Sequence, residues 1–164
     1  FQTTKLICIM NMIEEGNSAP DFSGIDQDGK SISLADFKGQ KVVLYFYPKD
    51  DTPGCTAQAC NLRDNHSELL SKGINIIGVS ADTSAKHQKF ITKYDLPFPL
   101  IADTEKSLIQ AFGVWGEKKF MGKVYDGIHR TSFVINEEGI VIKRINKVKT
   151  KDHTNQILEA LSLN

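Results

Sequence analysis

The sequence predicts one α/β domain in which a central mixed β-sheet is flanked by helices and preceded by an N-terminal β-hairpin. Two apolar runs rich in β-branched and aromatic residues, 42–47 and 74–79, indicate buried strands. Helical segments alternate with strands along most of the chain, and a hairpin followed by a helix ends it. The length of 164 residues suits a single domain with one good core.

The first half of the chain begins with the predicted hairpin. Its strands cover 21–25 and 31–34, and Asp26-Gln27-Asp28-Gly29 between them is a strong turn signal. The elements expected next are a short helical turn at 36–39, the strand at 42–47, a long helix from 53 to 71 closed by Lys72-Gly73, and the strand at 74–79.

The second half continues the alternation and then changes to a hairpin. Ser84 is placed to cap a helix over 84–94. The elements expected after it are a strand at 100–102, a helix at 104–112, a glycine-rich connection at 114–129, a hairpin with strands 131–135 and 140–142, and an amphipathic helix at 154–163. Within the connection, we expect Trp115 and Phe120 to anchor the core or the loop.

Composition and charge exclude several classes of function. The formal net charge is zero, so no basic field favours nucleic acid or a membrane surface. No apolar run approaches the about 20 residues that a membrane span needs. The lysine-rich segment 143–151 is interrupted by Ile145 and Val148, which indicates the solvated face of a strand.

The start of the chain and the cysteine count bear on the compartment. We treat residues 1–11 as an extension or the remnant of an engineered protease site, and 12–164 as the domain. The three cysteines are Cys8, Cys55 and Cys60, and we assign Cys8 no role. An odd count without a signal peptide argues against a secreted disulfide framework and favours a reducing, cytoplasmic setting.

The segment after strand 42–47 is the most informative part of the chain. Thr52 is placed as an N-cap, Pro53 suits the first helical position, and Cys55 then falls in the first turn. Unpaired N–H groups and the helix dipole favour an anion there, and the thiolate is the nucleophilic form of cysteine. The alternative is a free cysteine that only packs in the core.

Cys60 lies five residues after Cys55. On one helix the two residues are separated by about 7.5 Å of axial rise and about 140° around the axis. A disulfide needs Cα atoms within about 7 Å of each other. If the pair forms a disulfide, the first turns of the helix must therefore unwind.

Several segments resemble one protein family. The spacing Pro48-x-x-x-Thr52-x-x-Cys55 is similar to the active-site signature of the peroxiredoxins. The segment 52–60, together with Gly113-Val114-Trp115-Gly116-Glu117-Lys118 and the motif at 121–130, resembles the bacterioferritin-comigratory-protein branch, also called peroxiredoxin Q. The likeness covers roughly residues 14–162, and it implies a thioredoxin-like fold.

The resemblance implies a role for each residue of the signature. Cys55 would be the peroxidatic cysteine, which attacks the peroxide and becomes a sulfenic acid. Thr52 would hold the peroxide with its hydroxyl, although it also suits a plain N-cap. Pro48 would shield the sulfur or simply terminate the strand. An arginine at the place of Arg130 completes the family's site and would stabilise the thiolate. Cys60 would resolve the sulfenic acid as an intramolecular disulfide.

The resemblance also implies partners and leaves alternatives open. It predicts a thioredoxin-dependent peroxidase for hydrogen peroxide and organic hydroperoxides, of the atypical 2-Cys type and a monomer. We expect no cofactor, and the four histidines show no metal-ligand spacing with the cysteines. The alternatives are a thiol-disulfide redox sensor or relay, and a holdase or structural protein with inert cysteines.

Overall fold

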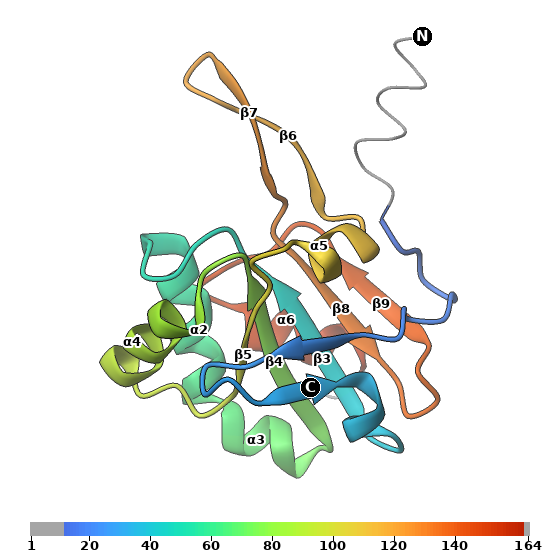
Figure 1. The fold of residues 1–164 in the computed structure, drawn as a ribbon. Helices are drawn as coiled ribbons and strands as arrows, with labels where there is room; N and C mark the ends of the chain where they lie inside the picture. The colour runs from blue at the N-terminus through green and yellow to red at the C-terminus, as the bar shows by residue number, and fades with distance from the viewer. Residues whose placement is uncertain (1–11, 163–164) are drawn as a thin grey trace, which may run out of the picture.

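The computed structural model describes residues 12–162, so residues 1–11, including Cys8, and residues 163–164 lie outside the description. A five-stranded mixed sheet with the order β5-β4-β3-β8-β9 forms its centre (Figure 1). Strands β3, β4 and β5 run parallel, whereas β8 is antiparallel to both β3 and β9. The strands are β3 (Lys41–Phe46), β4 (Ile74–Ser80), β5 (Leu100–Ala102), β8 (Thr131–Ile135) and β9 (Val141–Ile145).

Strand β3 occupies the middle of the sheet because its side chains are apolar on both faces. Residues 42–47 are all buried, and alternate side chains enter two separate cores. The first core receives Val42, Leu44 and Phe46, and the second receives Val43 and Tyr45. This two-sided burial confirms the prediction of a sheet covered on both faces.

Helices cover the second core. They contribute apolar side chains such as Leu62, Leu69, Phe90 and Ile157 to it. The helices are α2 (Pro53–Asp64), α3 (His66–Ser71), α4 (Ser84–Tyr94) and α6 (His153–Ala160).

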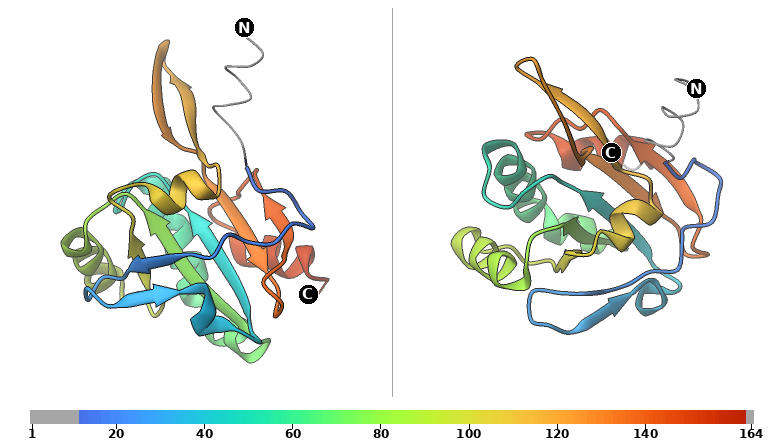
Figure 2. Two further views of the ribbon diagram at one scale, coloured as in Figure 1. Left: turned by 45° about the vertical axis from the view of Figure 1, so that its right-hand side comes forward. Right: turned by 45° about the horizontal axis from the view of Figure 1, so that its top comes forward.

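The N-terminal hairpin and one short helix cover the first core, as the views in Figures 1 and 2 show. Phe22 and Ile32 from the hairpin region pack there with Leu108, Ile109 and Phe112. The elements are β1 (Ser23–Ile25), β2 (Ser31–Ser33), the 3₁₀ helix η1 (Leu34–Phe37) and α5 (Ser107–Ala111).

The long helix predicted over 53–71 is two helices. It breaks at Asn65, whose side-chain amide donates a hydrogen bond to the backbone carbonyl of Asn61 at 2.8 Å. A polar side chain that bonds the local backbone competes with helix continuation. The cap of α4 is also one residue earlier than predicted, since Thr83 rather than Ser84 accepts from the Lys86 amide.

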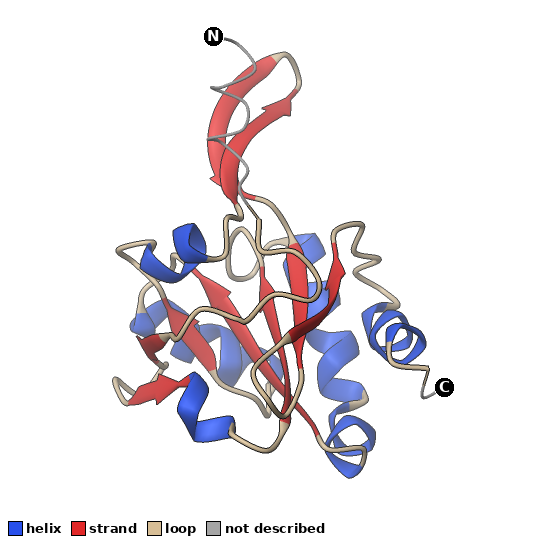
Figure 3. Ribbon diagram, turned by 90° about the vertical axis from the view of Figure 1, so that its right-hand side faces the viewer, coloured by secondary structure: helices blue, strands red, loops and turns tan. Residues whose placement is uncertain are grey.

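Segment 114–129 is a β-hairpin, and the expectation of an irregular connection was wrong. Strands β6 (Trp115–Phe120) and β7 (Lys123–Ile128) pair antiparallel and project from the body of the protein (Figure 3). Met121 and Gly122 both have positive φ, as a tight hairpin turn requires. Trp115 packs against the first core as expected, but Phe120 is 65% exposed and anchors nothing.

Two further boundaries differ from the expectation for the C-terminal half. Helix α5 starts at Ser107 rather than at 104, because the Asp103 carboxylate accepts hydrogen bonds from the Ser107 hydroxyl and the Ile109 amide. The lysine-rich segment leaves the sheet after Ile145. Its remainder is a loop that the Gln156 side chain ties to α6 through Lys147 and Lys149.

A buried histidine in α6 should make stability depend on pH. The His153 ring accepts from the Ser132 hydroxyl at 2.7 Å and donates to the Gln156 side chain at 2.9 Å. Burial, which the Gln156 hydrogen bond partly offsets, lowers the pKa of His153 to about 4.

Below the ordinary histidine pKa of about 6.5, the unfolded chain binds a proton that the folded protein excludes. Stability should therefore fall by roughly 3 kcal/mol as the pH drops from 7 to 4. Urea unfolding of the wild type and of His153→Gln between pH 7 and pH 4 measures the free energy of unfolding and tests this prediction. The variant should show a flatter profile, and an identical slope in both proteins would contradict the assignment.

Candidate active site

The start of α2 places Cys55 as the sequence predicts. Thr52 is the N-cap with extended dihedrals, Pro53 is the first helical residue, and Cys55 is the third. The Thr56 amide makes the first helical bond, to the Thr52 carbonyl at 2.8 Å. The amides of Gly54 and Cys55 thus have no acceptor within the helix. This concentrates N–H groups and the positive end of the helix dipole beside the sulfur.

Thr52 occupies the predicted N-cap position, but its hydroxyl makes no capping hydrogen bond to the helix. Its oxygen Oγ1 instead donates to the Lys49 carbonyl at 3.0 Å. The lone pairs of Oγ1 remain available to accept a hydrogen bond from another molecule.

Arg130 contacts Cys55 although 75 residues separate them in the chain. The guanidinium Nη2 donates to Cys55 Sγ at 3.3 Å, and the Cys55 side chain is 2% exposed. The pairing of β3 with β8 explains the approach. Phe46 at the end of β3 lies opposite Thr131 at the start of β8, so Arg130 falls at the edge from which α2 begins. The guanidinium thus places a positive charge beside the Cys55 sulfur.

Gln58 holds the other side of the same guanidinium. Its Oε1 accepts from Arg130 Nη1 at 2.7 Å, and the residue is fully buried. Gly54 leaves room for this arrangement, since a Cβ there would lie 3.2 Å from Arg130 Nη2. Gln58 was not predicted from the sequence as a site residue, although its position three residues after Cys55 puts it on the same helix face.

A second cation lies near Arg130. Lys118, on β6, donates from Nζ to the Ile128 carbonyl at 2.9 Å. Burial and the neighbouring Arg130 guanidinium lower the pKa of the Lys118 ammonium. Lys118 and Arg130 also line a cavity of about 430 Å³ with His129 and Lys147, which lets a small molecule approach the guanidinium.

The loop before α2 is anchored by Asp50. Its carboxylate lies 2.6 Å from His87 Nδ1 of α4 and accepts from the Tyr47 hydroxyl at 2.5 Å. The Asp50 amide donates to Asp82 at 2.8 Å, and His87 Nε2 donates to the Ile101 carbonyl at 2.9 Å. This network was not predicted from the sequence, because it depends on how α4 packs.

Asp50, Asp82 and His87 are the one group of potential metal ligands found among residues 12–162, with ligand atoms within 4.8 Å of one another. Each carboxylate and both ring nitrogens already take part in hydrogen bonds with protein groups. The cluster therefore has the character of a positioning network.

The remaining predicted residues, Pro48 and Cys60, lie in the chain on either side of Cys55. Pro48 is half-buried in the loop that leaves β3. Cys60 is a half-buried free thiol on α2, about 7.5 Å further along the helix axis than Cys55.

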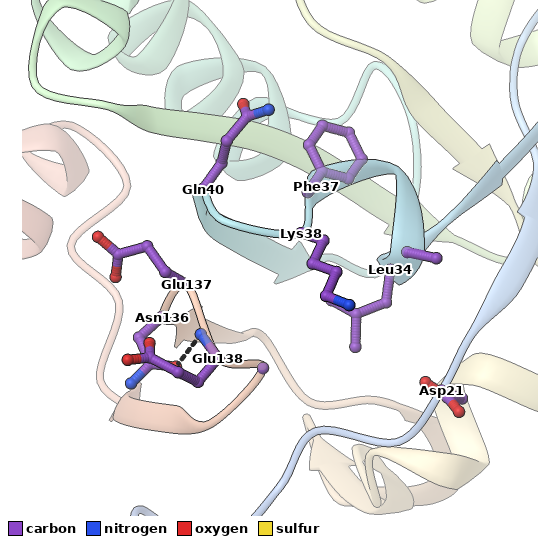
Figure 4. Close-up of a pocket in the computed structure, with 10 residues that line it drawn as sticks. Asp21, Leu34, Phe37, Lys38, Gln40, Asn136, Glu137 and Glu138 are labelled. Carbon is purple, nitrogen blue, oxygen red and sulfur yellow. Dashed lines mark hydrogen bonds between the residues drawn. The ribbon is translucent and has the colours of Figure 1, made fainter.

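A separate cavity lies at the opposite end of β3. It has a volume of about 250 Å³ and is lined by residues around η1 and the β8–β9 turn, among them Phe37, Lys38 and Glu138 (Figure 4). No cysteine is among its lining residues.

Comparison with known proteins decides the family. The pattern of the AhpC/TSA family matches residues 16–144. The chain is 51% identical over 152 residues to the putative peroxiredoxin Bcp of Haemophilus influenzae, covering 93% of this chain and 98% of the other. It is 48% identical over 152 residues to peroxiredoxin Bcp of Escherichia coli K12, covering 93% and 97%. The chain belongs to the Bcp, or peroxiredoxin Q, branch of the AhpC/TSA family.

Solved peroxiredoxin structures support the same family assignment. A peroxiredoxin Q from Xanthomonas campestris is 34% identical, with a TM-score of 0.83, and the match covers 92% of this chain and 98% of that one. The expected thioredoxin-like fold is thereby confirmed. As a Bcp peroxiredoxin the protein is a thiol-dependent peroxidase that uses a peroxide substrate and a thiol reductant. No helix within residues 12–162 is long and apolar enough to cross a membrane.

The contact between Gln58 and Arg130 should affect the reaction with peroxide. Gln58→Leu removes the acceptor that orients the guanidinium and should slow oxidation of Cys55 by roughly 10-fold. Stopped-flow mixing of the reduced protein with hydrogen peroxide measures it. Gln110→Leu, a change of the same type on α5, serves as the control. An unchanged rate in Gln58→Leu would show that Arg130 needs no support.

Proposed function

We propose that Cys55 is the peroxidatic cysteine and Cys60 the resolving cysteine of a thioredoxin-dependent peroxidase for hydrogen peroxide and organic hydroperoxides. The observation that carries the proposal is the 3.3 Å contact between Arg130 Nη2 and the buried Cys55 sulfur. It joins a cation, the start of a helix and a thiol in one place, as a nucleophilic sulfur requires.

In the first step the Cys55 thiolate attacks the terminal oxygen of the peroxide. An S–O bond forms and the O–O bond breaks, so the sulfur is oxidised to a sulfenic acid while the peroxide is reduced. The leaving hydroxide or alkoxide takes a proton from water. Arg130 would stabilise both the attacking thiolate and the departing oxygen, and the free amides of Gly54 and Cys55 would add to this field.

Thr52 and Pro48 would position the substrate. Since the Thr52 hydroxyl donates to Lys49, its oxygen can accept the O–H of a peroxide and hold it in line with the sulfur. The half-buried ring of Pro48 would limit the access of water. Organic hydroperoxides are included because the related Xanthomonas campestris protein is described as having alkyl peroxide reduction activity, and the cavity beside Arg130 offers room.

In the second step the Cys60 thiol attacks the Cys55 sulfenic acid and releases water, which leaves an intramolecular disulfide. Both thiols belong to α2, and Cys60 is free in the reduced form. Because an intact helix keeps them too far apart, the first turns of α2 must unwind for the bond to form.

In the third step a dithiol of thioredoxin reduces the disulfide. A disulfide within one chain needs no second copy, which supports a monomer formed by a single domain over 12–164. A cycle that starts from free thiols fits a cytoplasmic, reducing compartment. Turnover with thioredoxin also distinguishes an enzyme from a redox sensor, which would pass its oxidation to one partner protein.

Two cysteine variants test the assignment. With hydrogen peroxide, thioredoxin, thioredoxin reductase and NADPH, the wild type should turn over and Cys55→Ser should be inactive. With one equivalent of peroxide, Cys60→Ser should react once and form a sulfenic acid that dimedone traps, without catalytic turnover. Sustained turnover by Cys55→Ser would overturn the peroxidatic role. Sustained thioredoxin-dependent turnover by Cys60→Ser would overturn the resolving role.

A further inference from the structure

The contacts around α2 define which segment has to unwind. On the N-terminal side, Asp50 is fixed, because its side chain is 6% exposed and pairs with a fully buried His87. On the C-terminal side, Asn61 binds the start of α6, accepting from the Thr154 amide at 2.8 Å and donating to the Lys151 carbonyl at 3.1 Å. Between these two fixed points lies a ten-residue segment, 51–60, that holds both cysteines.

Asp51 begins this segment and is held by a different kind of contact. Its carboxylate accepts from Lys93 Nζ at 2.8 Å and from the Tyr94 hydroxyl at 2.7 Å. These hydrogen bonds, the one from Lys93 first, lower the pKa of the Asp51 carboxyl. The ion pair lies at the surface, with side chains 42% and 59% exposed. We call the contacts of Asp51 with Lys93 and Tyr94 the α4 clasp.

Tyr94 reaches both ends of the segment. Its hydroxyl holds Asp51, and its backbone carbonyl accepts from Arg63 Nη1 at 2.7 Å, beyond Asn61. The end of α4 therefore binds both the loop before α2 and the C-terminal part of α2. Exposed ion pairs and single hydrogen bonds of this kind are weak and easily broken. The clasp can open while the buried contacts of Asp50 stay intact.

We propose that Lys93 and Tyr94 are positioning residues that hold Asp51 and thereby set how often segment 51–60 unwinds. The proposal rests on the proposed resolving role of Cys60. Once Cys55 is a sulfenic acid, two reactions compete for it. Attack by the Cys60 thiol gives a disulfide and water and needs the unwound segment, whereas attack on a second hydrogen peroxide gives a sulfinic acid and water and uses the helical one.

The ratio of Cys55 sulfinic acid to Cys55–Cys60 disulfide reports how much the α4 clasp limits unwinding. The double variant Lys93→Met with Tyr94→Phe removes both contacts, while Phe keeps the ring that packs against Phe90. Unwinding becomes easier, so the yield of Cys55 sulfinic acid relative to disulfide should fall roughly fivefold at a given hydrogen peroxide concentration. Intact-mass and peptide mass spectrometry quantify both products. Lys89→Met, on the same helix and without an ion pair among the described residues, should match the wild type.

The Cys60→Ser variant separates an effect of the α4 clasp on unwinding from an effect on the reaction with peroxide. In Cys60→Ser no disulfide competes, so sulfinic acid should form at the same rate with the clasp intact or removed. An equal ratio of sulfinic acid to disulfide in the wild type and the double variant would contradict the role of Lys93 and Tyr94. A rate of sulfinic acid formation that still depends on these two residues in Cys60→Ser would contradict it as well. A wild type that forms no Cys55–Cys60 disulfide would instead overturn the proposed function.

Amide hydrogen exchange tests the boundaries of the segment. In the disulfide form, the amides of residues 56–60, which bond within α2 in the reduced protein, should lose protection. The Asp50 amide, bonded to Asp82, and the Thr154 amide, bonded to Asn61, should keep it. Loss of protection at the Asp50 amide would contradict the fixed point at Asp50, and full protection across 56–60 would contradict the unwinding itself.

Discussion

The site depends on the antiparallel pairing of β3 with β8. That register places Thr131 beside Phe46, so the guanidinium of Arg130 meets the helix that starts a few residues after β3. The sheet holds this geometry because β3 is buried on both faces and contributes to both cores. A cation brought to a buried sulfur by a strand paired within the central sheet would stay in place through the proposed reaction, as electrostatic stabilisation requires.

The helix that carries Cys55 in its first turn also keeps Cys60 away from it. In the proposed mechanism, peroxide reduction needs α2 intact from its first turn, since the Gly54 and Cys55 amides and Gln58 would act from helical positions. Disulfide formation needs the same turns unwound. Buried contacts hold Asp50 just outside residues 51–60 and Gln58 within them, whereas Asp51 is held by a surface contact. A locally unfolding segment of low stability is a common source of functional motion.

Local sequence patterns predicted the features of the fold that depend on residues close together in the chain. Thr52-Pro53 places Cys55 in the first turn of α2, and the apolar run 42–47 predicts a buried strand. Contacts between residues far apart in the chain could not be predicted from local patterns. The proximity of Arg130 to Cys55 was expected only from the family resemblance. The bond between Asp50 and His87 depends on where α4 packs. The hairpin at 115–128 was missed because its projecting strands are mostly exposed, so the alternation of buried and exposed residues that marks a strand is weak there.

The most direct test of this account is the rate at which hydrogen peroxide oxidises Cys55 in Arg130→Met, measured by stopped flow with Arg130→Lys as the charge-retaining partner. Removing the guanidinium should slow oxidation by at least roughly 100-fold. Arg130→Lys should fall between the two, because lysine keeps the charge but cannot contact Cys55 and Gln58 together. Urea unfolding should show that all three proteins are folded. A wild-type rate in folded Arg130→Met would contradict the central role of the contact between Arg130 and Cys55.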